Sequence, residues 1–171
     1  MDAISLLKKH HRKAESGLKK LCKGYDKDTL DLVASQLAAH MIIEETLFYP
    51  AVRRVNPDLV LENYEEHAVA QFELKRLIAT SEDDERFSAR AMALLDMIKH
   101  HVEAEEEKLF PKVMRALDED ELESLGDELE KSFDDLVERG HEEILPRSPA
   151  KVTADRQSQR FATEGSMHAM R

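Results

Sequence analysis

Apolar residues recur along the chain at a spacing close to 3.6 residues, which is the repeat of an α-helix. This pattern predicts five helices, at about 3–23, 28–54, 57–79, 84–116 and 119–139. The gaps between them are short and contain helix-capping residues such as Asp118. Because short connections place successive helices antiparallel, we expect an all-α, up-down-up-down four-helix bundle with an additional C-terminal helix.

The helical pattern ends at Gly140, and residues 141–171 show no apolar period. We therefore expect one bundle domain at 1–140 and a flexible C-terminal tail at 141–171. The fifth helix has an apolar stripe that must be buried, either against the bundle or, alternatively, in a homodimer contact. That stripe consists of Leu122, Leu125, Leu129, Phe133, Leu136 and Val137.

Composition and charge narrow the classes of function. A net charge of −11 argues against nucleic-acid phosphates and anionic membranes as partners. The longest stretch without Asp, Glu, Lys or Arg, residues 32–43, is too short to span a bilayer. The single cysteine, Cys22, cannot form an internal disulfide, and the N-terminus does not resemble a secretory leader. We expect a cytoplasmic protein with neither a nucleic acid nor a membrane as partner.

Candidate chemistry comes from a motif that occurs twice. His40 lies four residues before Glu44 and ten before a proline, and His101 stands in the same relation to Glu105 and a second proline. Residues four apart on a helix lie on one face, so each copy directs an imidazole and a carboxylate to one point. One such pair arises easily by chance in an acidic chain. Whether the two pairs are metal ligands or chance pairs on a solvated face therefore depends on where they lie on their helices.

Each of the first four predicted helices has a histidine on its apolar stripe. Counting along the helices from the connecting turns puts these histidines at similar heights, with a looser match, by about one turn, for the third and fourth. Unpaired charges buried in a bundle core cost several kcal/mol each, and a bound cation removes that cost. The candidate metal ligands are His11, His40, Glu44, His67, His101 and Glu105.

Mixed imidazole and carboxylate ligands favour iron, manganese or zinc over calcium or magnesium. Two ions fit this set better than one. If Glu44 and Glu105 each bridge two octahedral ions, the four histidines and a bridging oxo or hydroxo group leave two positions open for an exogenous ligand. The Glu-x-x-His motif of ferritin-like di-iron proteins is absent, because no glutamate lies three residues before any of these histidines.

In this order, the residues resemble the hemerythrin-like HHE cation-binding domain. The resemblance also includes Phe48-Tyr49-Pro50 and Leu109-Phe110-Pro111, and it covers roughly residues 1–120. It implies a four-helix bundle around two iron ions, oxo- or hydroxo-bridged, that meet dioxygen or hydrogen peroxide. By this resemblance the terminal ligands are His11, His40, His67 and His101, and the bridging ligands are Glu44 and Glu105.

One position departs from the oxygen-carrying hemerythrins. They have a second histidine one turn after the third-helix ligand, where this chain has Gln71, and a neutral amide is a poor iron ligand. We therefore expect a centre that reacts with dioxygen or peroxide, in peroxide breakdown, ferroxidation or oxidative-stress defence. Alternatives are non-enzymatic oxygen, iron or redox sensing or oxygen binding, and a purely structural metal bundle.

Three further residues are candidates for supporting the ligands. Glu15 lies one turn after His11 and is either its partner or a solvated carboxylate, while Tyr64 and Gln71 are expected near the site. Tyr49 also lies close enough to donate a hydrogen bond.

The remaining residues near the motifs are assigned structural roles. His10 and His100 are rotated by about 100° from their neighbours and are expected to face solvent or the rim. Pro50 and Pro111 are expected to kink or end their helices beyond the metal layer. The methionines expected to fill the core are Met92, Met97 and Met114.

Overall fold

The computed structural model describes residues 1–145. Most of the expected tail, residues 146–171, lies outside the described residues. The long helices are α1 (Ala3–Leu21), α2 (Lys27–Ile43), α4 (Pro57–Ile78), α5 (Phe87–Ala104) and α7 (Glu119–Arg139). The short segments are the π-helical η1 (Glu44–Phe48) and η2 (Glu105–Leu109), and the α-helical α3 (Tyr49–Val52), α6 (Phe110–Ala116) and α8 (His141–Ile144).

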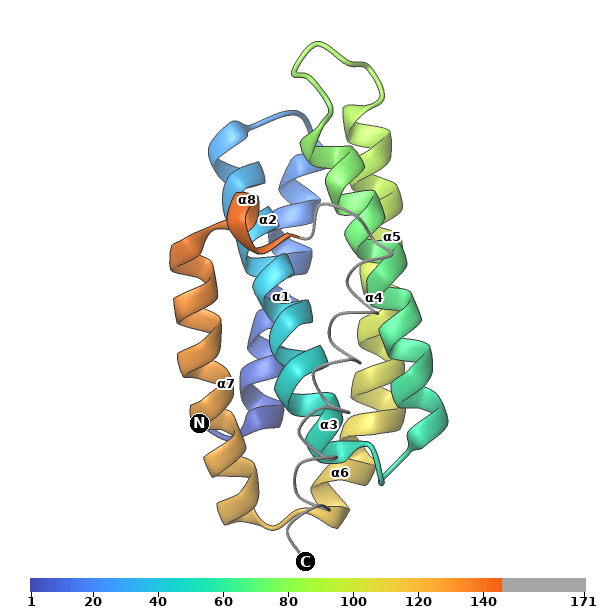
Figure 1. Ribbon diagram of the computed structural model, residues 1–171. Coiled ribbons are helices and arrows are strands. Elements are labelled where there is room, and N and C mark those ends of the chain that lie inside the picture. The colour runs from blue at the N-terminus through green and yellow to red at the C-terminus, as the bar shows by residue number, and fades with distance from the viewer. Residues whose placement is uncertain (146–171) are drawn as a thin grey trace, which may run out of the picture.

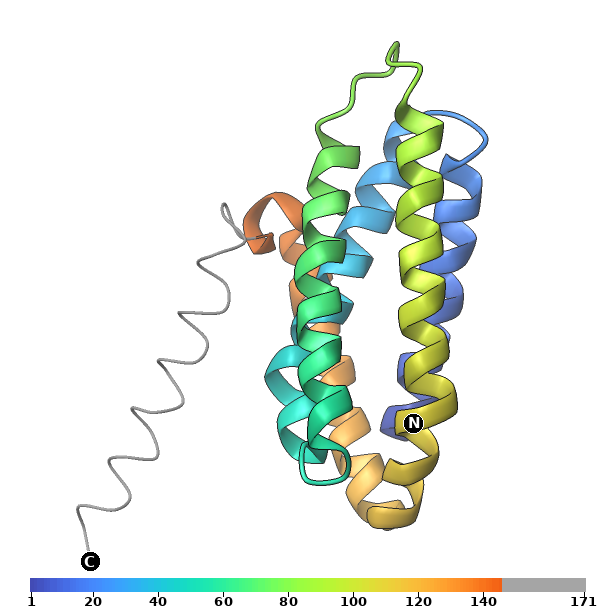
Figure 2. The ribbon, with the colours of Figure 1, turned by 90° about the vertical axis from the view of Figure 1, so that its right-hand side faces the viewer.

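Helices α1, α2, α4 and α5 form an up-down-up-down four-helix bundle (Figures 1 and 2). In this bundle α1 contacts α2 and α5, and α4 contacts the same two helices. The described residues contain no strand. The predicted all-α fold is therefore confirmed, and within the described residues no helix is both long and apolar enough to cross a membrane.

Aspartates mark where three of the long helices begin. The side chains of Asp2, Asp26 and Asp118 each accept a hydrogen bond from a main-chain N–H three residues further on. Asp118 also forms a reciprocal capping box with Glu121. These bonds satisfy donors that the first helical turn leaves without a partner, so the helix starts are set locally by sequence.

The helices change their winding before the two prolines and end after them. η1 and η2 each insert one π-helical turn just before the proline, and the α-helical segments that contain the prolines end beyond the ligand layer, at Val52 and Ala116. Each turn begins at a predicted ligand, Glu44 or Glu105, whose carbonyl accepts from the N–H five residues later. The change from α-helical to π-helical winding therefore lies in the layer of predicted metal ligands. Single π-helical turns are often found at functional sites.

The core consists of two apolar clusters with a polar layer between them. Along α1, Leu7 belongs to one cluster and Ala14 to the other, with His11 in between. Along α4, Val60 and Leu74 flank the polar layer in the same way. Two of the predicted core methionines are wrong: Met92 and Met114 are about half exposed, at 47% and 49%. Both methionines lie outside the apolar stripe of their helices, so the packing of the bundle does not bury them.

Helix α7 covers the bundle on the side away from α4 and α5 (Figure 1). It contacts α1 and α2 and buries Leu129 and Phe133, so the predicted packing of the fifth helix against the bundle is confirmed. Gly126 permits this close approach, because a Cβ atom there would collide with the main-chain oxygen of Met1.

The packed structure continues past residue 140. Helix α8 packs against α2, Ile144 is buried, and the main-chain N–H of His141 donates a 3.0 Å hydrogen bond to Ser35 Oγ. Residues 141–144, which the sequence analysis assigned to the tail, therefore pack against the bundle.

Candidate metal centre

The structure brings all six predicted ligands into one buried layer. Each bundle helix contributes a histidine, and the two glutamates are the first residues of η1 and η2. No member is more than 5% exposed. The members are His11, His40, Glu44, His67, His101 and Glu105.

These residues form two overlapping groups that could each hold a cation. Site A consists of His11, His40, Glu44 and Glu105, and site B of Glu44, His67 and His101. Within each group the candidate ligand atoms lie within 4.8 Å of one another. Glu44 belongs to both groups, so its carboxylate is placed to bridge two ions.

Glu44 presents both of its oxygens to the site. Its Oε2 lies 3.2 Å from His40 Nε2 and 3.4 Å from His67 Nε2, and its Oε1 lies 3.9 Å from His11 Nε2. Neither oxygen has a hydrogen-bond partner. This carboxylate is therefore free to bind through two atoms.

Glu105 presents one oxygen only. Its Oε1 accepts hydrogen bonds from the Tyr49 hydroxyl at 2.8 Å and from Asn63 Nδ2 at 3.2 Å. Its Oε2 has no hydrogen-bond partner and lies 3.2 Å from His11 Nε2 and 3.6 Å from His101 Nε2. The two glutamates, which occupy equivalent places in the repeated motif, are thus not equivalent in the structure.

The donor set fits a metal because its polar atoms are buried and unsatisfied. Buried atoms without a hydrogen-bond partner include His11 Nε2, His40 Nε2, both oxygens of Glu44 and Oε2 of Glu105. A buried polar atom without a partner costs about 1–3 kcal/mol, and more if it is charged. Cations that bind at sites A and B would satisfy all of these atoms together.

Three further carboxylates hold the outward-facing nitrogens of the ligand histidines. Glu106 lies 2.9 Å from His11 Nδ1, Glu45 lies 3.2 Å from His67 Nδ1, and Glu66 lies 2.7 Å from His101 Nδ1. Such carboxylates fix the ring orientation and make the imidazole a stronger ligand. Sequence reasoning missed them, although each is adjacent in sequence to a predicted ligand.

In the metal-free protein, two of the buried imidazoles are protonated and pair with neighbouring carboxylates. Burial alone would lower the pKa of His67, but the nearby carboxylates of Glu44 and Glu45 raise it to about 10. For the same reasons, with Glu105 as the main partner, the pKa of His11 is raised well above its usual value. These two imidazoles therefore hold protons near neutral pH.

The pKa values of His40 and Glu105 are shifted downward. Burial and the nearby imidazoles hold the pKa of His40 well below its usual value. Burial alone would raise the pKa of Glu105, but His101 and His11 lower it to about 2. Neutral His40 and ionised Glu105 are the protonation states that bind a metal.

Of the predicted supporting residues, Gln71 and Tyr64 contact Glu45, and Glu15 lies in a surface ion-pair cluster. Gln71 is buried, and its Nε2 donates a 3.1 Å hydrogen bond to Glu45 Oε1, so it reaches the site through Glu45. Tyr64 donates to the main-chain carbonyl of Glu45. Glu15 does not contact His11; it pairs with Arg12 and Lys19, while Glu106 takes the place beside His11.

The prediction for His10 is wrong. Its side chain is buried and stacks on Phe133 of α7 with a centroid distance of 3.8 Å. The sequence places His10 off the bundle stripe, but α7 covers that face. His100, in contrast, is exposed as expected, with its Nε2 3.7 Å from Glu66.

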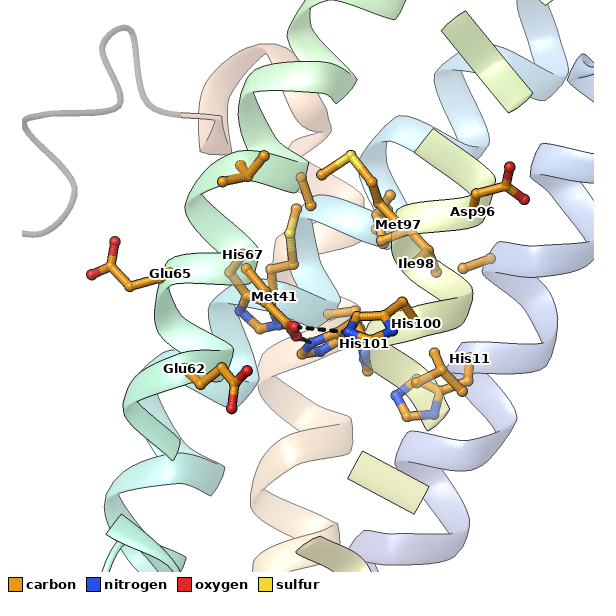
Figure 3. A pocket seen from close by; sticks show the side chains of 17 residues that line it. His11, Met41, Glu62, Glu65, His67, Asp96, Met97, Ile98, His100 and His101 are labelled. Atoms are coloured by element: carbon orange, nitrogen blue, oxygen red, sulfur yellow. Dashed lines mark hydrogen bonds and ion pairs between the residues drawn. The ribbon is translucent and has the colours of Figure 1, made fainter. Parts of the chain in front are cut away.

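A pocket of about 540 Å³ extends from the surface between α4 and α5 to the metal layer (Figure 3). Apolar side chains, including Leu37 and Met41, form much of its wall, and the four ligand histidines line it. In Figure 3, Glu65 and Asp96 lie toward its outer side. The acidic residues at the outer side favour the entry of neutral or cationic molecules over anions.

Comparison with known families agrees with this geometry. Residues 2–113 match the hemerythrin HHE cation binding domain. The chain belongs to this family. The crystal structure of a hemerythrin HHE cation binding domain-containing protein from Mycobacterium kansasii is similar at 21% identity, with a TM-score of 0.71 over 81% of this chain and 89% of that one. At that identity the likeness supports the fold. No curated protein matches the sequence.

Membership accounts for the metal layer. The HHE family binds cations, and the described His and Glu groups are candidate metal sites in this chain. The hemerythrin-like bundle and its buried layer therefore belong to a metal-binding domain.

Proposed function

We propose that this HHE domain holds two iron ions and reacts with hydrogen peroxide or dioxygen. The observation that carries the proposal is the buried set of imidazoles and carboxylates at two overlapping sites, in which the ligand atoms of site A, including the shared Glu44, have no hydrogen-bond partner. The ligands would be His11, His40, Glu44 and Glu105 at site A, and Glu44, His67 and His101 at site B. When bound, iron would supply one-electron redox chemistry toward peroxide or dioxygen.

The chain itself would control what reaches the ions. The pocket of about 540 Å³ connects the layer with the surface, and a small neutral molecule such as hydrogen peroxide or dioxygen can enter it. Acidic residues at its outer side oppose the approach of anions. Small neutral molecules are therefore the class of ligand that best fits this access path.

The environment of Gln71 supports a centre that reacts with dioxygen or peroxide over one that only carries oxygen. A histidine ligand would be expected at this position in an oxygen carrier, but the Gln71 amide donates to Glu45 instead. Site B therefore receives one ligand fewer from the chain than it would with a histidine at position 71. This leaves more room at site B for an exogenous molecule. Such an open site supports peroxide breakdown or ferroxidation, and with them a role in oxidative-stress defence.

Peroxide turnover by the iron-loaded protein tests this proposal. We expect hydrogen peroxide to be consumed with release of dioxygen, two molecules of peroxide giving two of water and one of dioxygen. The metal-free and zinc-loaded proteins are the controls and should be inactive. A stable coloured adduct without turnover would instead favour the alternative of an oxygen-binding or sensing module.

The sensing alternative rests on one contact. Phe133 of α7 stacks on His10, whose ring lies edge-on to His40 at a centroid distance of 5.8 Å. A change at His40 could thereby be transmitted to the surface helix. Sensing predicts that α7 alters its hydrogen exchange when peroxide is added, whereas a purely catalytic role leaves α7 unchanged.

A further inference from the structure

The outer part of the pocket between α4 and α5 carries acidic side chains and an exposed histidine. The residues there are Glu62, Glu65, Glu66, Asp96 and His100, and within residues 1–145 no lysine or arginine lines the pocket. A path lined by charges of one sign concentrates ions of the opposite sign and speeds their arrival. This path therefore favours cations, and it leads to the buried ligand layer.

Glu66 connects the outer part of the pocket with the buried layer. Its Oε2 lies 2.7 Å from Nδ1 of the ligand His101, whereas its Oε1 lies 3.7 Å from Nε2 of the exposed His100. The second distance is too long for a hydrogen bond. It suits two ligands of one metal ion, because atoms that each lie about 2.1 Å from an ion are roughly 3–4 Å apart. An imidazole and a carboxylate thus face each other at the spacing of a cation site.

Glu62 supplies a second carboxylate to this position. It lies one helical turn before Glu66 on α4, and residues four apart share one face of a helix. In Figure 3, the side chain of Glu62 extends toward the pocket, whereas that of Glu65 points away from it. The name outer site is used below for Glu62, Glu66 and His100 together, and Glu65 is a neighbouring carboxylate outside it.

The inner end of the same pocket presents ligand atoms that have no partner. His11 and His40 line the pocket, are only 1% and 4% exposed, and each leave Nε2 without a hydrogen-bond partner. A cation that enters between the exposed carboxylates therefore reaches unsatisfied ligands without crossing a second surface. The pocket thus joins an exposed position suited to a cation to a buried one.

We propose that the outer site receives a divalent transition-metal ion from solvent and passes it through the pocket to the buried layer. Mixed imidazole and carboxylate ligands favour iron, manganese or zinc over calcium or magnesium. Because exposed side chains lose conformational freedom when they bind, the outer site holds the ion only weakly. The inference depends on the buried metal layer, but it does not depend on the reaction with peroxide or dioxygen proposed above.

The rate of metal uptake tests the proposal. Metal-free protein is mixed with Co²⁺ in a stopped-flow spectrometer, and the visible absorption of bound Co²⁺ is followed. We expect Glu62→Gln to slow uptake at low Co²⁺ concentration by about tenfold, the low end of what focused charges add to association rates. His100→Ala should slow it as well, because it removes a ligand of the outer site. The final amount of bound Co²⁺ should stay the same in both variants.

Glu65→Gln is the matched control. It removes the same charge from a neighbouring position of α4 but leaves the outer site intact, so uptake should keep nearly the wild-type rate. The measurements are made at an ionic strength of about 0.15 M, at which charges more than about 8 Å apart are largely screened. Any difference between Glu62→Gln and Glu65→Gln then reports a local effect and not the net charge of the protein.

Three results of the uptake experiment would overturn the proposal. Equal slowing in Glu62→Gln and Glu65→Gln would show that overall charge sets the rate. An unchanged rate in His100→Ala would remove the imidazole from the path. A lower final metal content in Glu62→Gln or His100→Ala would show that these residues maintain the buried layer and do not deliver ions to it.

Two further outcomes separate this inference from the proposed function. Wild-type protein that takes up no Co²⁺ would overturn the metal-binding layer and this inference with it. Uptake that depends on the outer site, in a protein whose iron-loaded form does not turn over peroxide, would support this inference and contradict peroxide breakdown.

A second measurement detects the outer site itself. The buried layer is first filled with Zn²⁺, which Mn²⁺ does not displace because it binds such ligands more weakly. Added Mn²⁺ is paramagnetic and broadens the NMR signals of nearby nuclei. We expect the imidazole signals of His100 to broaden first, and Glu62→Gln to reduce this broadening. If the signals of the acidic helix α7 broaden as much as those of His100, Mn²⁺ binds any exposed carboxylate and the outer site is contradicted.

Discussion

The hydroxyl of Tyr64 donates a 2.9 Å hydrogen bond to the main-chain carbonyl of Glu45. In a π-helical turn this carbonyl would be bonded by the N–H five residues later, but residue 50 is a proline and has none. Tyr64, from α4, thus supplies a donor to the turn that begins at Glu44. A side chain from a neighbouring helix supports the winding that presents a predicted ligand.

Tyr64→Phe should therefore destabilise the protein while keeping the ring contact with Tyr49. We expect the free energy of unfolding to fall by about 0.5–1.5 kcal/mol, the usual net contribution of one hydrogen bond. Denaturant unfolding of the metal-free protein measures it, with Tyr25→Phe as control. Equal stability of wild type and Tyr64→Phe would show that the turn does not depend on this bond.

Glu66→Gln should weaken metal binding without removing a ligand. The carboxylate lies 2.7 Å from His101 Nδ1, and the neutral amide that replaces it supports the ring less well. We expect the affinity for the ion at site B to fall by about tenfold or more. Competition with a chelating dye measures this, and Glu65→Gln, at the preceding residue of the same helix, is the matched control. Equal effects of the two substitutions would contradict a specific role for Glu66.

Metal binding should release protons, and affinity should therefore rise with pH. In the metal-free protein the pKa of His67 is raised to about 10 and that of His11 is also raised, so both rings are protonated at neutral pH. A metal must displace both protons, giving a release of about two per chain. Calorimetry in buffers of different ionisation enthalpy measures this number. Binding without proton release would contradict the pairing of these imidazoles with Glu44, Glu45 and Glu105.

Gln71→His tests whether this position keeps site B open. A histidine there would add a ligand to site B, so we expect slower loss of the site B ion to a chelator and slower peroxide turnover, each by about tenfold. Gln71→Glu, which also removes the amide donor to Glu45, separates ligation from loss of that hydrogen bond. If Gln71→His left both rates unchanged, position 71 would not control the open site.

The fold and the six-ligand layer could be predicted because both depend on local periodicity. The spacing of His40 and Glu44 fixes a common helix face, and the apolar residues around them fix which face is buried. The π-helical turns could not be predicted in the same way. A proline inside a helical run indicates a disturbance, but where the chain absorbs it depends on donors such as Tyr64 in another helix.

The supporting residues were missed because they are determined by contacts between helices. Glu106 follows a ligand in an acidic segment and looks solvated in sequence, yet it lies beside His11 of another helix. Glu15 has the right spacing from His11, but Lys19 and Arg12 pair with it. His10 was placed at the rim because its burial depends on Phe133, a residue more than a hundred positions away.

The metal content of the protein, measured together with its visible spectrum before and after addition of peroxide, tests the central claim most directly. The account predicts two iron ions per chain, a spectrum that changes on addition of peroxide, and loss of both properties in Glu44→Ala, which removes the carboxylate shared by the two sites. One ion per chain, zinc in place of iron, or a spectrum that peroxide does not alter would contradict it.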